Sequence, residues 1–278
     1  MKLGVFTVML PDLSPEDAAP ALKQAGYDGV EWRVTHIPAE RKQESPSFWG
    51  NNLCTFDITE ADAAQAKQLA ASANLDIPSL GTYISVGSMD EFKQTLSFAE
   101  AAGAPAFRVR MPRNQTPYWT LFQETQTFLA EAIKLASAKN IKILIEIHQN
   151  SIVTSASSAR LMLQDFDPAQ IGVIHDAGNM AREGFEHYQM GLEMLGAHLS
   201  HVHVKNAAYS LPSGDEGVWE PCWSPLEYGV VDFKMLFKAL KAVGYDGWLV
   251  VEDFSQKRPT LDALSYNRDF VHRHWDAA

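Results

Sequence analysis

The sequence predicts a single α/β domain over residues 1–278, built as a closed (β/α)8 barrel of the TIM type. Short runs of β-branched apolar residues alternate with longer helical patterns along the whole chain, which is typical of βαβ units on a parallel sheet. We count eight such pairs, and 278 residues that are 46% hydrophobic suffice for the large core of a barrel. No Gly-x-Gly-x-x-Gly follows the first strand, which argues against an open dinucleotide-binding sheet.

Strands and helices are expected in strict alternation. The strands are expected near residues 2–8, 28–34, 76–82, 105–111, 141–148, 171–176, 199–205 and 248–254. The helices are expected near residues 15–25, 59–74, 89–102, 118–139, 155–165, 182–196, 232–243 and 259–273. The apolar run at residues 2–8 resembles a short signal peptide, but it lacks a basic flank and a small-residue cleavage site, so we assign it to the first strand.

Residues at the helix ends support these boundaries. Ser14 before Pro15 is typical of an N-cap followed by proline in the first turn, and Asp17 completes an imperfect capping box. Gly26 and Gly244 are each followed by Tyr-Asp-Gly and a strand, which indicates that a left-handed glycine ends the helix. The longest irregular stretch, residues 206–230, is rich in Gly, Pro and Trp and could cover a site.

The charge and the cysteine content argue against several classes of protein. A formal net charge of −11 repels phosphate backbones, so no nucleic acid partner is expected. Only Cys54 and Cys222 occur, far apart in sequence, which fits a reducing compartment better than a disulfide framework. No run approaches the roughly 18 to 20 apolar residues that cross a bilayer. We therefore expect a soluble cytoplasmic protein with no membrane partner, although the closely spaced Arg108, Arg110 and Arg113 leave room for a local cationic pocket.

Four acid or imidazole side chains stand in separate apolar runs of the C-terminal half, namely Glu146, Asp176, His203 and Glu252. A buried carboxylate is costly unless it is paired or binds a metal, so three of them at the ends of hydrophobic strands need a common explanation. A divalent cation supplies that explanation. In a (β/α)8 barrel the reactive groups collect at the C-terminal ends of the strands, which is where all four lie.

The alternation of side chains along each strand places all four on one side. In the fifth strand three isoleucines face the helices, which leaves Glu146 facing the barrel interior. In the seventh strand two valines face the helices, so His203 and Lys205 point inward. By the same alternation Asp176 and Glu252 point inward from the sixth and eighth strands. The four candidates are therefore expected to converge on one cavity.

The composition of this set indicates the type of ion. Three carboxylates and one imidazole suit the harder ions, so we expect one divalent metal ion, with Mn²⁺ favoured and Mg²⁺, Co²⁺ or Zn²⁺ as alternatives. Four protein ligands leave about two positions of an octahedral ion for a substrate carbonyl and its neighbouring hydroxyl. The competing explanation is a buried ion-pair network, for which Arg33, Arg108 and Arg110 are available.

The order of these residues resembles the sugar phosphate isomerase/epimerase family, whose members have a xylose isomerase-like TIM barrel. The shared pattern is a strand-end Glu, an Asp followed three residues later by His or Asn and then Met, a His-x-His pair, and a final Val-Glu. The resemblance extends from Gly29, in Gly-Val-Glu-Trp, to Glu252. It implies a metal-dependent activity on a small carbohydrate, and it leaves a homo-oligomer open.

Carried over to this chain, the resemblance implies that Glu146, Asp176, His203 and Glu252 bind the metal, and that Glu146 and Glu252 are also the catalytic acid and base. A metal-bound carbonyl acidifies the adjacent C–H bond by stabilising the enediolate, which is Lewis-acid catalysis. One glutamate removes this proton. The other returns it to the opposite face in an epimerase, whereas in an isomerase it goes to the neighbouring carbon.

Three differences separate this sequence from the ketose 3-epimerases of that family. Asn179 stands where those enzymes tend to have a substrate-contacting His, Ile152 where they have a substrate-binding Glu, and Tyr209 where they have an Arg. Asn and His both donate hydrogen bonds, so Asn179 stays a candidate for substrate binding. The differences argue against simple ketose epimerisation and leave the proton-transfer residues intact.

Three further side chains are candidates for substrate contacts. His148 is expected at the cavity mouth above Glu146, with a bond to a loop backbone as the alternative. Lys205 could reach a substrate oxygen or an adjacent carboxylate. Arg110, near the end of the fourth strand, is the candidate for an anionic or hydroxylated substrate group, with a structural pair to Glu31 as the alternative.

Other polar and aromatic residues near the predicted site are better explained by structural roles. His201 lies one layer deeper than the predicted ligands, where a hydrogen-bonded core role is favoured over ligation. His175 and Asp253 have the wrong parity for the cavity. Trp219 and Trp223 could stack on a sugar ring, but core packing is the simpler interpretation for each.

These inferences lead to one main function and three alternatives. The main prediction is a divalent-metal-dependent isomerase or epimerase that moves a proton α to the carbonyl of a sugar, keto-sugar or cyclitol. The nearest alternative is a metal-dependent lyase at the same site, in which the enediolate expels a β-oxygen. A sugar-binding protein without catalysis is weaker because both glutamates are present. A DNA-repair endonuclease is weaker because its metal cluster would need more inward ligands in strands two to four.

Overall fold

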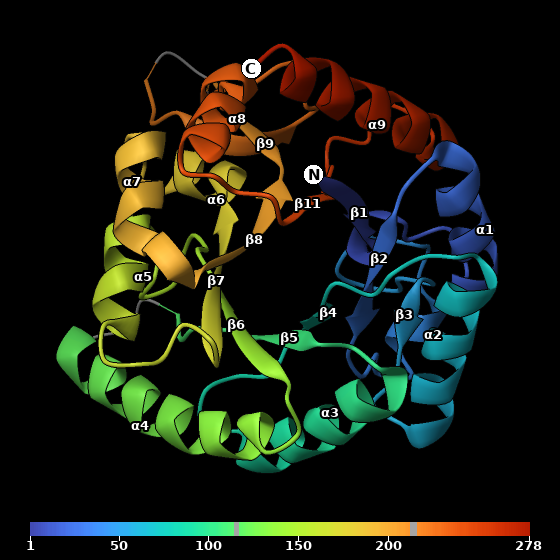
Figure 1. The fold of residues 1–278 in the computed structure, drawn as a ribbon. Coiled ribbons are helices and arrows are strands. Elements are labelled where there is room, and N and C mark those ends of the chain that lie inside the picture. Colours follow the sequence, from blue (N-terminus) through green and yellow to red (C-terminus); the bar gives the residue numbers. More distant parts are fainter. Residues whose placement is uncertain (114–116, 212–215) are drawn as a thin grey trace.

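Eight parallel strands close into a barrel that a ring of helices surrounds (Figure 1). The computed structural model describes residues 1–113, 117–211 and 216–278. The barrel strands are β1 (Lys2–Phe6), β2 (Gly29–Val34), β4 (Leu80–Thr82), β5 (Ala106–Val109), β6 (Lys142–Glu146), β7 (Ile171–Asp176), β8 (Leu199–Val204) and β11 (Trp248–Val251). They pair in this order, and β11 pairs with β1 to close the ring. The predicted fold class is confirmed.

Helices connect successive strands and cover the outside of the barrel. They are α1 (Pro15–Ala25), α2 (Glu60–Ser72), α3 (Met89–Ala102), α4 (Tyr118–Ser137), α5 (Ala156–Leu163), α6 (Ala177–Arg182), α7 (Tyr188–Leu195), α8 (Phe233–Ala242) and α9 (Thr260–Asp276). The last helix, α9, lies beside α1, so the two ends of the helical ring meet (Figure 1). The buried Tyr27 hydroxyl donates to the Leu264 carbonyl at 2.9 Å and ties them together.

The helix ends form where the predicted capping residues stand. The Ser14 hydroxyl accepts a hydrogen bond from the Asp17 backbone N–H at 3.2 Å, and Pro15 begins α1. Gly26 and Gly244 have φ values of 88° and 71°, in the left-handed region that favours glycine. These residues therefore set the ends of α1 and α8 as the sequence indicates.

Two predicted elements differ from the structure. The strand expected at residues 76–82 is shortened to β4, because Pro78 has no backbone N–H to donate to a neighbouring strand. The helix expected at residues 182–196 is instead two helices, α6 directly after β7 and α7 further on. Gly184 lies between them with a φ of 93°, and a Cβ there would lie 2.3 Å from the Thr154 carbonyl oxygen. The chain therefore turns at this glycine instead of continuing as one helix.

The stretch predicted to be irregular, residues 206–230, contains a hairpin. Strands β9 (Asn206–Ser210) and β10 (Glu220–Ser224) pair antiparallel directly after β8. Residues 212–215, between them, lie outside the described residues. A two-residue strand, β3 (Thr55–Phe56), pairs with the end of β2. The hairpin follows the C-terminal end of β8, and β3 lies beside the last two residues of β2, so both are at the mouth of the barrel.

The barrel interior is filled in layers below the mouth. Ala106, Leu144 and Ile174 form a small buried cluster apart from the main core between the strands and the helices. The Phe6 ring also lies inside, and a Cβ at Gly81 would come within 2.1 Å of it, so only glycine leaves room for that ring. The polar side chains one step further along β5, β6 and β7 therefore stand on an apolar floor. Among the described helices, none is long and apolar enough to span a membrane.

Candidate metal centre and cavity

The four side chains predicted as ligands lie together at the C-terminal mouth. Glu146 and Asp176 are the last residues of β6 and β7, His203 is in β8, and Glu252 directly follows β11. The register pairs Asp176 with His203, and His203 with Val250, so neighbouring strands carry these groups at similar heights. One potential ligand atom from each of the four lies within 4.8 Å of the other three, and all four residues are buried.

The two ring nitrogens of His203 face different partners. Its Nδ1 atom lies 3.1 Å from Glu146 Oε1, 3.7 Å from Asp176 Oδ2 and 3.8 Å from Glu252 Oε2. Its Nε2 atom lies 3.2 Å from Oε2 of Glu31, a residue of β2. Burial disfavours the charged imidazole, yet these surrounding carboxylates raise the pKa of His203 well above its usual value. Nδ1 is thus the nitrogen directed at the three carboxylates.

Two buried cations balance the carboxylates. Arg108 Nη1 lies 2.5 Å from Glu146 Oε2, while Lys205 Nζ lies 2.6 Å from Asp176 Oδ2 and also contacts Glu252 Oε2. Burial opposes ionisation of Glu146, but Arg108 and then His203 hold the pKa of this carboxyl well below its usual value. Burial raises the pKa of Glu252 despite the adjacent Lys205. The two glutamates are therefore pushed toward opposite protonation states.

The donor set fits a divalent cation. Two ligand atoms on opposite sides of an ion with bonds of about 2.1 Å are about 4.2 Å apart, which is close to the spread of this cluster. Within the described parts of the chain, the buried Asp176 Oδ2 atom accepts no well-aligned hydrogen bond. Three carboxylates and one imidazole are typical ligands of Mn²⁺, Mg²⁺ or Zn²⁺. The residues present could hold such an ion, and their role as ligands stays a prediction.

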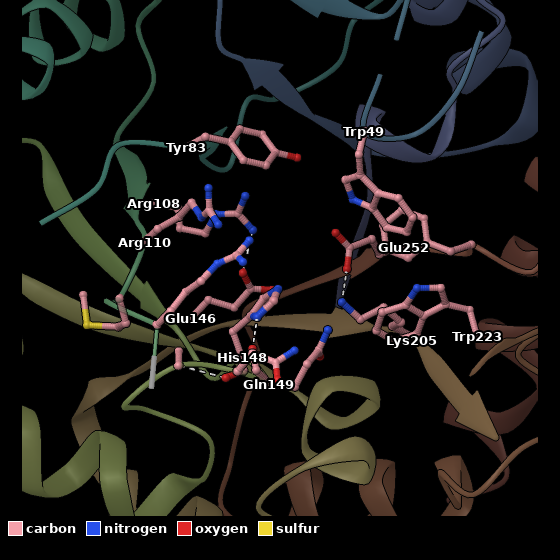
Figure 2. A pocket seen from close by; sticks show the side chains of 15 residues that line it. Trp49, Tyr83, Arg108, Arg110, Glu146, His148, Gln149, Lys205, Trp223 and Glu252 are labelled. Atoms are coloured by element: carbon pink, nitrogen blue, oxygen red, sulfur yellow. Dashed lines mark hydrogen bonds and ion pairs between the residues drawn. The ribbon is translucent and has the colours of Figure 1, made fainter. Parts of the chain in front are cut away.

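A cavity of about 280 Å³ opens directly above the cluster (Figure 2). Figure 2 shows Arg108, Arg110 and Tyr83 on one side of it, and Lys205, Glu252 and Trp223 on the other. The lining residues are Trp49, Tyr83, Arg108, Arg110, Met111, Arg113, Glu146, His148, Gln149, Asn150, Ser151, Lys205, Trp223, Glu252 and Phe254. Aromatic rings beside charged and amide groups suit a ligand with both C–H faces and hydroxyls.

Three of the four residues predicted to bind substrate line this cavity, namely His148, Lys205 and Arg110. Asn179 is not among the described lining residues. It is fully buried, and its side-chain amide donates to Glu146 Oε1 at 3.3 Å and to the Ile147 carbonyl at 3.2 Å. In this structure Asn179 therefore acts on Glu146, and contact between Asn179 and a substrate stays a prediction.

For each predicted substrate-binding residue the sequence also left a structural contact open, and the structure forms some of these contacts and not others. Lys205 contacts the adjacent carboxylates, and His148 Nδ1 lies 2.6 Å from the Gln149 carbonyl while the side chain still faces the cavity. The alternative pairing of Arg110 with Glu31 is not formed in the described structure. Instead Glu31 contacts His203 and, at 2.9 Å, His201 Nε2. His201 thus has the buried, hydrogen-bonded place that its deeper position predicts.

The other residues for which a structural role is predicted lie in different surroundings. Asp253 accepts a hydrogen bond from Asn267 at 3.0 Å, and His175 is fully buried behind β7. Trp219 is 54% exposed, so the expected core packing is wrong for this residue. Trp223 is partly buried and lines the cavity, where Lys205 Nζ lies 5.0 Å from its ring centre. The hairpin of β9 and β10 is what delivers Trp223 to the site.

Sequence reasoning missed several features of the site. The pairing of Arg108 with Glu146 is one of them, although Arg108 has the same parity as Arg110 and pairs in register with Leu144 below Glu146. Glu31 lies inside the barrel, as its parity along β2 indicates, but its contact with His203 was not predicted. Trp49 and Tyr83 come from loops or strand ends without periodicity, so no sequence signal could have placed them.

The fold and the site together define a (β/α)8 barrel with a candidate metal centre at its C-terminal mouth. A sequence model of the xylose isomerase-like TIM barrel family matches residues 19–272. The chain therefore belongs to the xylose isomerase-like TIM barrel family, as its motifs indicate.

The chain is similar in sequence to individual proteins that are named for two different reactions. It is 28% identical over 129 residues to an inosose dehydratase of Geobacillus thermodenitrificans, and 29% identical over 128 residues to the L-ribulose-5-phosphate 3-epimerase UlaE of Escherichia coli. These alignments cover 42% and 46% of this chain, and the chain spans 42% of the length of each relative. The relatives are thus enzymes named for a dehydration and for an epimerisation.

Solved structures support the fold over the full chain. The structure of the IolI protein with a bound zinc atom has a TM-score of 0.76 and 15% sequence identity, and the match covers 100% of this chain and 99% of that one. At this identity the similarity concerns the fold.

Proposed function

We propose that the protein is a divalent-metal-dependent isomerase or epimerase, which moves a proton next to the carbonyl of a sugar, keto-sugar or cyclitol. The observation that carries this proposal is the convergence of Glu146, Asp176, His203 and Glu252 within 4.8 Å of one another beneath an open cavity. We propose these four as ligands of one ion, with Mn²⁺ favoured. Such an ion would act as a Lewis acid on the substrate carbonyl.

The two glutamates are suited to opposite proton-transfer roles. Figure 2 shows Glu146 and Glu252 on different sides of the cavity, so that a substrate between them would expose a different face to each. In the metal-free structure the pKa of Glu146 is lowered and that of Glu252 is raised, and we propose Glu146 as the base that removes the proton and Glu252 as the acid that returns one. Proton removal by Glu146 and return by Glu252 would invert one carbon centre.

The surrounding side chains would hold the glutamates and the substrate in place. Arg108 and Asn179 both contact Glu146, and Lys205 contacts Glu252, so each carboxylate is oriented by a hydrogen-bond donor. His148, Arg110 and Lys205 face the cavity and are proposed to contact substrate oxygens. The aromatic rings of Trp49 and Trp223 would exclude water from the reacting carbon.

A lyase that uses the same residues is the second candidate. After Glu146 removes the proton, a β-hydroxyl could leave with a proton from Glu252 instead of the carbon being reprotonated. The similarity to a protein named as an inosose dehydratase favours this alternative, and the similarity to a named 3-epimerase favours the first.

An experiment in D₂O separates the two reactions. The Mn²⁺-loaded protein is incubated with 2-keto-sugars, 3-keto-glucosides and inosose, and products are followed by NMR. Solvent deuterium in an isomeric product supports the isomerase or epimerase, whereas an unsaturated product supports the lyase. If none of these compounds gave either deuterium exchange or a product, that result would count against the proposed function. The Glu146→Gln variant is the control for uncatalysed exchange.

The remaining proposals concern the setting of the protein. Cys54 and Cys222 are free thiols in the described structure, which fits the reducing cytoplasm that we propose as its location. The negative net charge favours a small-molecule partner over nucleic acid. A homo-oligomer is compatible with this assignment.

A further inference from the structure

One wall of the cavity carries three arginines, more than are paired with the carboxylates of the site. Arg108, Arg110 and Arg113 all line the cavity. Arg108 is paired with Glu146, but no ion pair or hydrogen bond from the guanidinium of Arg110 or Arg113 occurs within residues 1–113, 117–211 and 216–278. The chain has 34 acidic residues and a net charge of −11, so acidic partners are not scarce. Among the described residues, these two arginines of one cavity thus have no acidic partner and could bind a ligand.

The backbone holds both arginines firmly. Arg110 forms a parallel bridge with Ser85, and its N–H donates to the Ile84 carbonyl at 2.9 Å. Arg113 forms an antiparallel bridge with Ser151, which lines the same cavity. Both side chains therefore project from an ordered ledge beyond β5. Because the backbone of this segment is already paired, ligand binding costs little further backbone conformational entropy here.

Among the described residues, no carboxylate forms an ion pair with Arg110. The side chain is half-buried, and its guanidinium carbon lies 5.6 Å from the ring centre of Tyr83. Burial, followed by repulsion from Arg108, lowers the pKa of Arg110. An anion at this point would offset the unfavourable effects of burial and of repulsion from Arg108. A guanidinium fork also matches the oxygens of a phosphate or a carboxylate, to which it can donate two parallel hydrogen bonds.

We propose that Arg110 and Arg113 form an anion subsite, so that the substrate is an acidic carbohydrate that carries a phosphate or a carboxylate. The inference rests on the proposed function, since it concerns the far end of a substrate whose carbonyl lies above Glu146 and Glu252. Figure 2 shows Arg110 on the side opposite Glu252 and Lys205, so the anionic end would lie away from the Glu252 carboxylate. The side chains of Gln149, Asn150 and Ser151 supply further donors on the same rim.

Matched ligand pairs test this subsite directly. Binding to the Mn²⁺-loaded protein is measured by calorimetry for D-ribulose 5-phosphate against D-ribulose, and for D-glucuronate against D-glucose. We expect one acidic member to bind at least about tenfold more tightly than its neutral partner, because hydrogen bonds to charged groups are the strong ones. Preference for the phosphate ester identifies a sugar phosphate, and preference for the uronate identifies a sugar acid. No preference in either pair overturns the proposal.

Variants assign the preference to the two arginines. In Arg110→Gln/Arg113→Gln the preference should fall to less than about twofold, because glutamine offers the anion no positive charge. Arg273→Gln, at an exposed arginine of α9, removes one positive charge away from the cavity, as Arg113→Gln does within it, and should keep the preference. A preference that survives in the double variant contradicts the assignment. Because Arg113 is exposed, the single Arg113→Gln variant should fold normally and lose part of the preference, which guards against a misfolded double variant.

The result can be separated from a failure of the proposed function. Arginine-dependent anion binding without deuterium exchange in D₂O would leave the subsite standing and remove the isomerase, epimerase and lyase reactions. Deuterium exchange on neutral keto-sugars without any preference for an acidic partner would support the proposed function and remove the anion subsite.

Discussion

His203 and Glu31 are joined across the barrel by a contact of 3.2 Å between Nε2 and Oε2, although 172 positions separate them in the sequence. This contact occupies one ring nitrogen and leaves the other, Nδ1, directed at Glu146. A carboxylate behind a ligating histidine fixes the ring orientation and raises the basicity of the nitrogen that faces the metal. Glu31 is therefore expected to tune metal affinity without touching the metal.

The Glu31→Gln variant tests this relationship. We expect metal affinity to fall by about 10- to 100-fold, because the amide does not supply the negative charge that supports the imidazole as a ligand. Titration with Mn²⁺ under competition with a chelator gives the dissociation constant. Glu227→Gln is the matched control, since Glu227 pairs with Arg258 and Lys257 away from the cluster. Equal affinity in the Glu31 variant and the control would show that this carboxylate has only a packing role.

Glu252→Gln should separate metal binding from turnover. The amide keeps one oxygen near the cluster, so some metal should still bind, but it cannot transfer a proton. Activity should fall by about 10²- to 10⁴-fold, the usual contribution of a general acid or base. Metal content and turnover are measured on the same preparation. Near-native activity in this variant would remove Glu252 from the proton-transfer step.

Lys205→Met should destabilise the metal-free protein. Lys205 is the cation shared by Asp176 and Glu252, and breaking a buried pair typically costs about 3–5 kcal/mol. Mn²⁺ should restore much of this loss, because a ligand that binds only the folded state stabilises it. Urea unfolding with and without Mn²⁺ measures both effects. Lys257→Met, which removes a partly exposed pair with Glu227, should change the stability by less than about 0.5 kcal/mol.

Metal content and activity should follow each other. We expect about one divalent ion per chain, because the four ligand atoms form a single cluster. A chelator should remove the ion together with the activity, and Mn²⁺ should restore both. Elemental analysis before and after dialysis is the measurement. An enzyme that is free of metal and fully active would contradict the proposed centre.

Because His175 is buried, we expect the free energy of unfolding to fall as the pH is lowered. Burial lowers the pKa of this imidazole to about 4, against about 6.5 in the unfolded chain. The unfolded state therefore takes up the proton first, so this group costs about 3 kcal/mol of stability as the pH falls from 7 to 4. His175→Leu should flatten the profile by that amount. His198 and His201, whose pKa values are also lowered, remain in both proteins, so parallel profiles would exclude the assigned cause.

The sequence predicts most of the fold because its two periodicities are local. Apolar runs of strand length and helices with clear caps, such as Ser14 and Gly26, are determined by neighbouring residues. The predicted helix boundaries around residues 176–188 are wrong because no local pattern marks them. Asp176 both ends β7 and caps α6, accepting a hydrogen bond from the Asn179 N–H at 2.8 Å, and no gap in the pattern marks that change. A turn at Gly184 then depends on how closely the chain approaches Thr154.

The site divides in a similar way between sequence and structure. Strand parity alone indicates that Glu146, Asp176, His203 and Glu252 share the barrel interior, because successive side chains of a strand point to opposite sides. Which cation meets which carboxylate follows from the register between strands. A β-bulge near Ser200, for example, aligns His201 with Ile174 and His203 with Asp176.

By itself, the sequence determined the barrel, the family and the four residues that converge, since each depends on local pattern and on residue type. The tertiary structure alone decided that Glu31 supports His203, that Lys205 joins Asp176 to Glu252, and that Arg110 faces an open cavity without a partner among the described residues. The physical reason is that these contacts join strands far apart in the chain. Their geometry exists only after the barrel has closed and its mouth is lined.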